Sequence, residues 1–297
     1  MSAKRNTGQC ALFTAAEILP PAMTPDLAGY DWLLANISGG KDSQAMLARL
    51  VEAATDAGVR DRIVTVFCDL GDDDEWPGTR ELAAGHAAHY SLRHEVVRRE
   101  VQLEDGSRVP QGLSEHIEAR GKWPSATTRY CTSDLKRAPV HRLLTRLAAE
   151  ARATGVTGRV RILNVMGLRA EESPARAHLP AFSHDERASN QTVREVDTWL
   201  PVHDWTEAEV WARIKTEGTR YHPVYDAGMP RLSCRFCVLA SKSALIRAAQ
   251  LDPAGARKRA DMETRMGHDF KYGMPMRDII AAAEAAASPV AVEGWVA

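Results

Sequence analysis

Hydrophobic residues divide much of the chain into short strands that alternate with helices. Residues 33–37 form an apolar run, and residues 63–69 form a nearly continuous one, as in a strand buried in a parallel sheet. Further strands are predicted at 94–98 and 161–166, and a helix at 79–90. Two other segments repeat apolar residues at helical spacing: Met46, Leu47, Leu50, Val51 and Ala54, and later Val140, Leu143, Leu144 and Leu147.

A polar, glycine-containing loop follows the first strand, and a helix begins directly after it. The glycines Gly39 and Gly40 let backbone N–H groups crowd around an oxyanion, and the helix dipole favours negative charge there. Lys41 adds a mobile cation, and hydroxyls at positions 38 and 43 add donors. Asp42 would repel a bare phosphate, so it indicates a bound divalent metal or a role in fixing the helix dipole. A plain turn between strand and helix is the alternative, but such a turn has no need of these side chains.

An acidic segment follows the strand at 63–69. Ligands of open α/β sheets bind at the carboxyl ends of strands, so Asp69 is expected to hold Mg²⁺ or to contact a ribose. Asp72 stays open between such a role and a surface position. The rest of the acidic segment 71–77 is interpreted as a solvated loop, and Cys68 as a small hydrophobe buried within the strand.

Two later segments place cations where an anion could bind. Hydroxyl groups, Cys131, Lys136 and Arg137 gather at a helix start, which favours anions and lowers the pKa of a thiol. Arg169 and Arg176 flank a pair of carboxylates just after the strand at 161–166, where two guanidiniums could clamp phosphate or sulfate. A surface helix with salt bridges is the alternative at the second position.

The composition is ordinary for a soluble chain of 297 residues, with 44% hydrophobic and 26% charged residues and a net charge of −1. No apolar run of about 18 residues predicts a membrane helix, and residues 1–9 lack the apolar core of a signal peptide, so a cytoplasmic protein without a membrane partner is expected. Five cysteines in such a chain favour metal or redox chemistry over disulfides. Cys10 is interpreted as an incidental thiol.

Five motifs in this order resemble the phosphoadenosine-phosphosulfate reductase family: Ser38–Ser43, Tyr130–Arg137, Gly167–Ser173, Trp199–Trp205 and Cys234–Cys237. The first is similar to the loop of the PP-loop ATP pyrophosphatases, which cleave ATP between its α- and β-phosphates. Within the family, the chain most resembles the branch with the ATP-pyrophosphatase subunits of DNA phosphorothioation systems. The resemblance implies an α/β, Rossmann-like adenine-nucleotide α-hydrolase (PP-loop) fold, with a central parallel sheet flanked by helices.

The resemblance also implies which residues act. Lys41, Asp42 and Arg169 are expected to be catalytic. ATP or an adenylyl sulfate is expected over the loop, with Mg²⁺ near Asp42 or Asp69. The complete nucleotide-binding set is predicted as Ser38, Gly39, Gly40, Lys41, Asp42, Ser43, Asp69, Gly167 and Arg169.

The cysteines depart from the family pattern. The reductases carry a nucleophilic cysteine in a short C-terminal motif, whereas the last cysteine here is Cys237, which argues against sulfonucleotide reduction. Iron–sulfur members use a Cys-Cys pair with C-x-x-C, but here Cys131 is followed by Thr132. Cys131, Cys234 and Cys237 are expected to hold a [4Fe–4S] cluster, with an open iron that could carry sulfide, or Zn²⁺. Cys10 as a fourth ligand and a metal-free pair of core thiols stay open as alternatives.

The chain is predicted to have three parts. Residues 1–29 form an irregular lead-in, residues 30–205 the PP-loop nucleotide-binding domain, and residues 206–297 a helical C-terminal region with the C-x-x-C motif. Within the nucleotide-binding domain, residues 101–128 are expected to form loops of a mobile insertion near the site, and residues 178–195 a flexible polar segment.

The resulting hypothesis is an ATP pyrophosphatase that adenylylates a substrate oxygen and prepares it for replacement by sulfur. The implied acceptor is DNA or another nucleic acid, the implied sulfur source a cysteine desulfurase or sulfur carrier, and a homo-oligomer stays open. One alternative is a phosphoadenylyl-sulfate or adenylyl-sulfate reductase that borrows a partner's thiol. Another is a non-catalytic subunit that binds ATP, or nucleic acid through a basic strip of Lys122, Arg129, Lys136 and Arg137, which the net charge of −1 disfavours.

Overall fold

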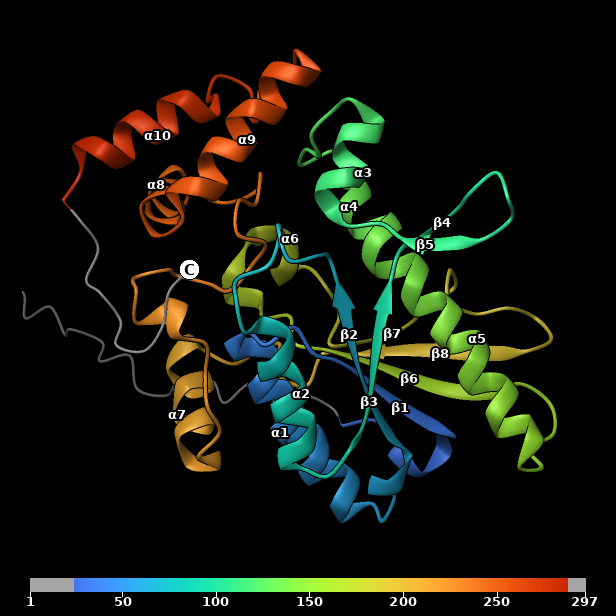
Figure 1. Cartoon of the computed structure of the whole chain (residues 1–297). Helices are drawn as coiled ribbons and strands as arrows, with labels where there is room; N and C mark the ends of the chain where they lie inside the picture. Colours follow the sequence, from blue (N-terminus) through green and yellow to red (C-terminus); the bar gives the residue numbers. More distant parts are fainter. Residues whose placement is uncertain (1–23, 288–297) are drawn as a thin grey trace, which may run out of the picture.

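The computed structural model describes residues 24–287 (Figure 1). Cys10, interpreted as an incidental thiol, lies outside these residues. Most of the predicted lead-in at 1–29 lies outside them as well. The described end of the lead-in contains a short 3₁₀ turn at Leu27–Gly29, in which Asp26 accepts a hydrogen bond from the Ala28 N–H. No helix in the described part of the chain is long and apolar enough to cross a membrane.

A six-stranded sheet in the order β3-β2-β1-β6-β8-β7 forms the centre of the described chain. Five strands are parallel, and the edge strand β7 (Phe182–His184) is antiparallel to β8. The parallel strands are β1 (Trp32–Asn36), β2 (Ile63–Asp69), β3 (Arg93–Arg98), β6 (Val160–Met166) and β8 (Arg194–Trp199). The sequence-based prediction of a central parallel sheet is therefore confirmed, with one antiparallel strand added at its edge.

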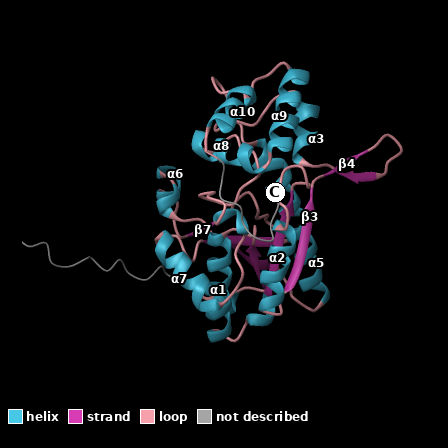
Figure 2. Cartoon of the chain, turned by 60° about the vertical axis from the view of Figure 1, so that its left-hand side comes forward, coloured by secondary structure: helices cyan, strands magenta, loops and turns pink. Residues whose placement is uncertain are grey.

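Helices cover both faces of this sheet because successive strand residues point to opposite sides (Figure 2). Leu33 packs with α1 (Lys41–Asp56) and α2 (Thr79–His89), whereas Leu34 packs with α5 (Ala138–Ala153). A further helix, α7 (Glu207–Glu217), packs its Val210 and Ile214 against Ala45 of α1. The nucleotide-binding loop predicted at 38–43 therefore lies between β1 and a helix that is held on two sides.

Two predictions of irregular structure are wrong. Residues 101–128 contain a small hairpin, formed by β4 (Glu100–Gln102) and β5 (Arg108–Pro110), and the helix α3 (Leu113–Arg120). The helix was missed because only Leu113 and Ile117 mark its buried face, and both pack against distant residues of the C-terminal helices. The polar segment at 178–195 contains β7 and the start of β8, whose polar side chains such as Asp197 are paired within the fold.

The C-terminal region is helical, as predicted, with α8 (Lys242–Leu251), α9 (Pro253–Met266) and α10 (Met276–Ala285). These helices stand above the carboxyl ends of the strands (Figure 1). They share one hydrophobic core with Leu70, Trp76 and Leu135 of the sheet domain. The C-terminal helices therefore cover the carboxyl edge of the sheet.

The acidic segment after β2 holds the C-terminal helices to the sheet domain. The interpretation of this segment as a solvated loop is therefore wrong for Asp74. The Asp74 side chain is buried, and its carboxylate lies 2.7 Å from the buried Arg259 guanidinium of α9 and accepts from the Ser114 hydroxyl at 2.8 Å. Its carbonyl accepts from the Arg235 N–H at 2.8 Å. Asp72 is solvated, with a side chain that is 97% exposed. The carboxylate at position 74 was not recognisable as buried because its partner lies 185 residues away.

Candidate nucleotide and thiol sites

The predicted loop turns sharply at Gly39, which has a φ of +73°, and its side chains hold it in shape. Ser43 Oγ accepts from the Ser38 N–H at 3.1 Å and donates to the Gly40 carbonyl at 2.8 Å. A Cβ on Gly39 would lie 3.1 Å from the Thr79 carbonyl, so the loop also packs closely against α2. Gly40 precedes the first residue of α1 and leaves the helix without a side-chain cap. The N-terminus of α1 is therefore an anion position, where backbone N–H groups have no partner within the helix.

Lys41 is buried at this position and surrounded by oxygen atoms. Its ammonium donates to the Pro230 carbonyl at 3.3 Å and lies 3.6 Å from Glu207 and 3.9 Å from Asp42. It also stands 5.3 Å from the centre of the Tyr225 ring. These contacts hold the Lys41 ammonium close to its own loop and to Pro230, which lies in the segment that leads to the C-x-x-C motif.

Tyr225 occupies the anion position itself. Its hydroxyl oxygen accepts from the Lys41 N–H at 3.0 Å and from the Leu232 N–H at 3.3 Å. Burial raises the pKa of Tyr225 to about 12, so the group is neutral at physiological pH. No sequence pattern marks Tyr225 as a site residue, and its place in the turn-rich stretch before the C-x-x-C motif is the one signal that could have indicated it.

Asp42 and Arg169 join the loop to the end of β6. The buried Arg169 places Nε 2.5 Å from Asp42 and Nη1 2.5 Å from Glu171, and also donates to the Trp205 carbonyl at 3.2 Å. Gly167 allows this approach, because a Cβ there would lie 2.6 Å from the Asp42 carbonyl oxygen. The structure thus brings these three predicted residues together, with Asp42 in the first turn of α1 as a partner of Arg169.

A group of arginines lies beside the loop. Burial lowers the pKa of Arg176, and the neighbouring guanidiniums of Arg231, Arg129 and Arg169 lower it further, although Asp42 acts in the opposite direction. Within the described chain, Arg176 forms an ion pair with Glu172. A pocket of about 380 Å³ adjoins one of these arginines and is lined by Thr128, Arg129, Tyr130, Thr132, Ser133 and Arg137. Such an excess of guanidiniums and hydroxyls suits a ligand with several negative charges.

Asp69 lies at the same edge of the sheet, but its carboxylate is already engaged. It lies 2.5 Å from both Arg80 and Arg98 and accepts from the Gly71 N–H at 2.9 Å. With a residue exposure of 2%, it is buried within this set of donors. Its role as a ligand of Mg²⁺ or ribose stays a prediction.

The described cysteines interact electrostatically with Lys136, whose residue is exposed. Desolvation lowers the pKa of this lysine, but the thiols of Cys234, Cys68, Cys237 and Cys131 raise it more, and the net shift is upward. Cys234 and Cys237 share a hydrogen bond that lowers the pKa of Cys237 and raises that of Cys234. Thiolates are the donors that Fe–S clusters and Zn²⁺ prefer, so the predicted residues fit such a group by their chemistry.

The spacing of these thiols differs from that of a preformed zinc site. Zinc–sulfur bonds of about 2.3 Å place the thiolates of a tetrahedral site about 3.8 Å apart. Among residues 24–287, no three cysteines bring their sulfur atoms within 4.8 Å of one another. The described cysteines are therefore not preformed as a closed three-thiolate site.

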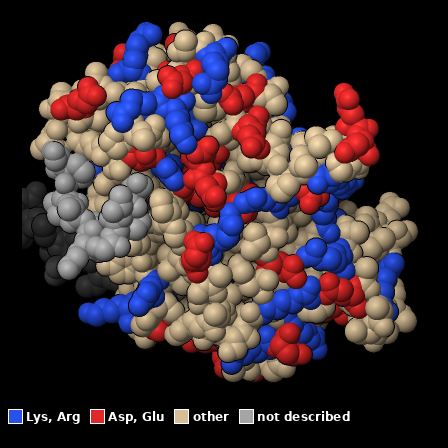
Figure 3. Space-filling model, viewed as in Figure 1, with Lys and Arg blue, Asp and Glu red and all other residues tan. Residues whose placement is uncertain are grey.

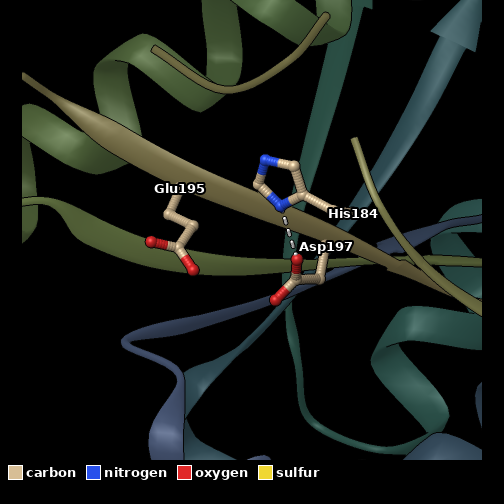
Figure 4. A group of neighbouring side chains, drawn as sticks. All are labelled: His184, Glu195 and Asp197. Carbon is tan, nitrogen blue, oxygen red and sulfur yellow. Dashed lines mark hydrogen bonds and ion pairs between the residues drawn. The ribbon is translucent and has the colours of Figure 1, made fainter. Parts of the chain in front are cut away.

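Among residues 24–287, the side chains that do approach one another this closely are His184, Glu195 and Asp197, on the edge strand β7 and its neighbour β8 (Figure 4). Asp197 contacts His184 Nδ1 at 2.9 Å and accepts from the Tyr30 hydroxyl at 2.8 Å. Glu195 lies 2.5 Å from Arg159. Because each carboxylate already has protein partners, this trio is an ordinary polar cluster.

Comparisons with known proteins place the chain in one family. The family described as "Phosphoadenosine phosphosulfate reductase domain" matches residues 33–240. An uncharacterized protein of Methanocaldococcus jannaschii is 26% identical over 79% of this chain and 48% of its own length. Adenosine 5'-phosphosulfate reductase of Allochromatium vinosum is 38% identical over 26% of this chain and 27% of its own length. The chain thus spans at most about half of these relatives.

Solved structures give more distant matches. Phosphoadenylyl-sulfate reductase from Candida auris has a TM-score of 0.45 and 18% identity, covering 70% of this chain and 83% of its own. The U34-tRNA thiolase NcsA from Methanococcus maripaludis, solved with its [4Fe–4S] cluster, has a TM-score of 0.43 and 13% identity, covering 89% of this chain and 74% of its own. Both TM-scores lie below 0.5.

Proposed function

Because the chain belongs to the phosphoadenosine phosphosulfate reductase domain family, we propose that it is a nucleotide-dependent enzyme of sulfur chemistry that cleaves ATP between the α- and β-phosphates. The observation that carries this proposal is the N-terminus of α1, where a buried lysine and a backbone N–H face a position held by a neutral hydroxyl. A phosphate oxygen would satisfy the same N–H with more charge.

In the proposed reaction, a substrate oxygen attacks the α-phosphorus opposite the oxygen that bridges to the β-phosphate. The bridging P–O bond breaks, pyrophosphate leaves with the electron pair, and the substrate's proton passes to water. The ammonium of Lys41 and the N–H groups at the start of α1 stabilise the charge that moves onto pyrophosphate. Arg169 is a positioning residue, since it holds the first turn of α1 through Asp42. Mg²⁺, when bound, would neutralise the phosphates near Asp42 or Asp69.

The arginine group supports a polyanionic partner for this site. Arg129 and Arg231 lie near Arg176, which also interacts with Asp42 of the loop, so this group would suit the phosphates of an acceptor such as DNA or another nucleic acid. On the face seen in Figure 3, positive and negative side chains are otherwise interspersed. The electrostatic attraction of a polyanion would therefore be confined to the arginine group. A cysteine desulfurase or sulfur carrier would supply the sulfur for the adenylylated oxygen.

A second candidate function is reduction of a sulfonucleotide, which the arginine group and the adjoining pocket also favour. Its product would be sulfite from phosphoadenylyl or adenylyl sulfate, given an external thiol. The two functions are separated by incubating the protein with ATP and Mg²⁺, and in parallel with each adenylyl sulfate and thioredoxin. Pyrophosphate release from ATP supports the first function. Sulfite release without pyrophosphate supports the second and contradicts the first.

A further inference from the structure

A cavity of about 410 Å³ lies near the carboxyl ends of β6 and β8, beside the edge strand β7. None of the residues assigned to ATP cleavage lines it. Its volume is in the range of ligand pockets in proteins. Its apolar lining consists of Met166, Leu168, Leu179, Pro180 and Leu200. Such a lining suits the flat face of a ring, so the polar groups of the cavity decide which ring can bind.

A row of polar side chains crosses the sheet and reaches this cavity. The row lies on the sheet face that carries α5, with one residue from each of β1, β6, β8 and β7: Asn36, Asn164, Thr198 and Ser183. In the sheet register, Thr198 pairs with both Asn164 and Ser183. Asn36 Nδ2 donates to Asn164 Oδ1 at 2.6 Å. Strands covered on both faces normally carry apolar side chains, so the row indicates that this part of the sheet does not face a hydrophobic core.

Thr198 is the residue of this row that points most clearly to a ligand. It is only 9% exposed and lines the cavity, but its hydroxyl has no hydrogen-bond partner among residues 24–287. The hydroxyl of its neighbour Ser183, which also lines the cavity, has no partner within the same range. A buried hydroxyl without a hydrogen bond costs free energy. A ligand with polar groups along its edge would satisfy both hydroxyls at once.

The charged side chains of the cavity select against a phosphate. Asp185 and Glu186 supply two carboxylates, whereas Arg187 supplies one guanidinium. His184 also lines the cavity, but its Nδ1 lies 2.9 Å from the carboxylate of Asp197 (Figure 4). The excess of negative charge repels an anion and favours a neutral ligand that donates N–H groups. The cavity therefore complements the arginine-lined pocket, which suits phosphate groups.

The cavity adjoins the proposed reaction site through Gly167. Its lining residues Met166 and Leu168 precede and follow this glycine, at which a Cβ would lie 2.6 Å from the Asp42 carbonyl oxygen. In the strand order, the cavity is on the β6 and β8 side of β1, whereas Asp69, the expected ribose contact of ATP, ends β2 on the other side. A group held in the cavity thus reaches the first turn of α1 from the side opposite Asp69.

We propose that this cavity binds an unpaired nucleobase of the acceptor nucleic acid, and that the base carries an exocyclic amino group. The proposal rests on the proposed function and names the part of the acceptor that its site recognises. The apolar lining contacts the face of the base, and the carboxylates and hydroxyls accept from its amino group. Adenine, cytosine and guanine carry such a group, and thymine does not. A base in a duplex must leave the stack to enter the cavity, so single strands are expected to bind better.

The test is a fluorescence anisotropy titration of the full-length protein with single-stranded oligo-dC, oligo-dA and oligo-dT of equal length, and with the duplex of the last two. Wild type is compared with Thr198→Val, Glu186→Gln and the control Glu104→Gln, at an exposed position between β4 and β5. We expect wild type and the control to bind oligo-dC and oligo-dA at least about fivefold more tightly than oligo-dT or the duplex. Each cavity variant is expected to lose most of this preference. Thr198→Val keeps the shape of the side chain, and circular dichroism verifies that both variants fold.

Three results would overturn the proposal. The first is a wild type that binds oligo-dT or the duplex as tightly as oligo-dC, or binds none of them. The second is an unchanged base preference in both cavity variants. The third is weaker binding of ATP to both variants in calorimetric titration, which would assign the cavity to the adenine of ATP itself.

Pyrophosphate release from ATP is followed in the same preparations. A base preference that depends on Thr198 and Glu186, without pyrophosphate release, would refute the proposed function and leave the base site intact. Pyrophosphate release without any base preference would do the reverse.

Discussion

The hydroxyl oxygen of Tyr225 accepts a hydrogen bond from the backbone N–H of Lys41 at 3.0 Å, at the point where a nucleotide phosphate is expected. The same oxygen accepts from the Leu232 N–H, two residues before Cys234. One hydroxyl therefore joins the nucleotide loop to the segment that leads into the thiol site. Nucleotide binding at the loop must displace this contact or rearrange it.

Tyr225→Phe is expected to strengthen ATP binding, because the competing hydroxyl is removed. A hydrogen bond of this kind contributes about 0.5–1.5 kcal/mol, which corresponds to roughly two- to tenfold in Kd. Calorimetric titration with a non-hydrolysable ATP analogue measures the change. Tyr221→Phe removes the exposed hydroxyl that contacts Asp226 and serves as the control. Weaker binding by Tyr225→Phe would show that the hydroxyl instead contacts the nucleotide.

Arg169→Ala is expected to lower the free energy of unfolding by about 3 kcal/mol, because it leaves Asp42 and Glu171 without their shared cation. Arg257→Ala, at an exposed position on α9, is the control and is expected to change little. Urea unfolding followed by fluorescence gives both values. A double variant with Asp42→Ala should recover part of the loss, and strict additivity of the two substitutions would refute the pairing.

Gly167→Ala is expected to destabilise the protein by about 1–3 kcal/mol and to slow pyrophosphate release. The added methyl would lie 2.6 Å from the Asp42 carbonyl, so β6 and the first turn of α1 must move apart. Gly85→Ala is the matched control, since a Cβ at that position of α2 meets nothing within 4 Å and favours the helix. Equal stability of the two variants would show that the close approach at Gly167 is unimportant.

Asp74→Ala is expected to loosen the C-terminal helices, because it leaves the buried Arg259 guanidinium without its carboxylate. The loss in unfolding free energy should be about 3 kcal/mol, and amide exchange should accelerate in α8–α10. Asp72→Ala removes a 97% exposed carboxylate two residues earlier and should do neither. If both variants behave alike, the acidic loop does not anchor helices α8–α10 over the sheet.

The sequence predicted well those features that depend on local pattern. The strand, glycine turn and helix around Lys41 follow from apolar spacing and the glycine pair, and the helical C-terminal region was also identified. Contacts between distant residues could not be predicted in the same way. The pairing of Asp74 with Arg259, the hydroxyl of Tyr225 on the Lys41 N–H, and the position of Cys68 near Lys136 each depend on how the C-terminal region or α5 packs. In the sequence, these residues look like a surface acid, a turn tyrosine and a strand hydrophobe.

The proposed ATP cleavage is tested most directly by pyrophosphate release from ATP and Mg²⁺, with Lys41→Ala compared to wild type. Lys215→Ala, which removes an exposed lysine at the far end of α7, is the control. We expect Lys41→Ala to reduce kcat/KM about a hundredfold or more, because the buried ammonium no longer offsets charge on the departing pyrophosphate, and Lys215→Ala to match wild type. Pyrophosphate release by Lys41→Ala at the wild-type rate would contradict the account.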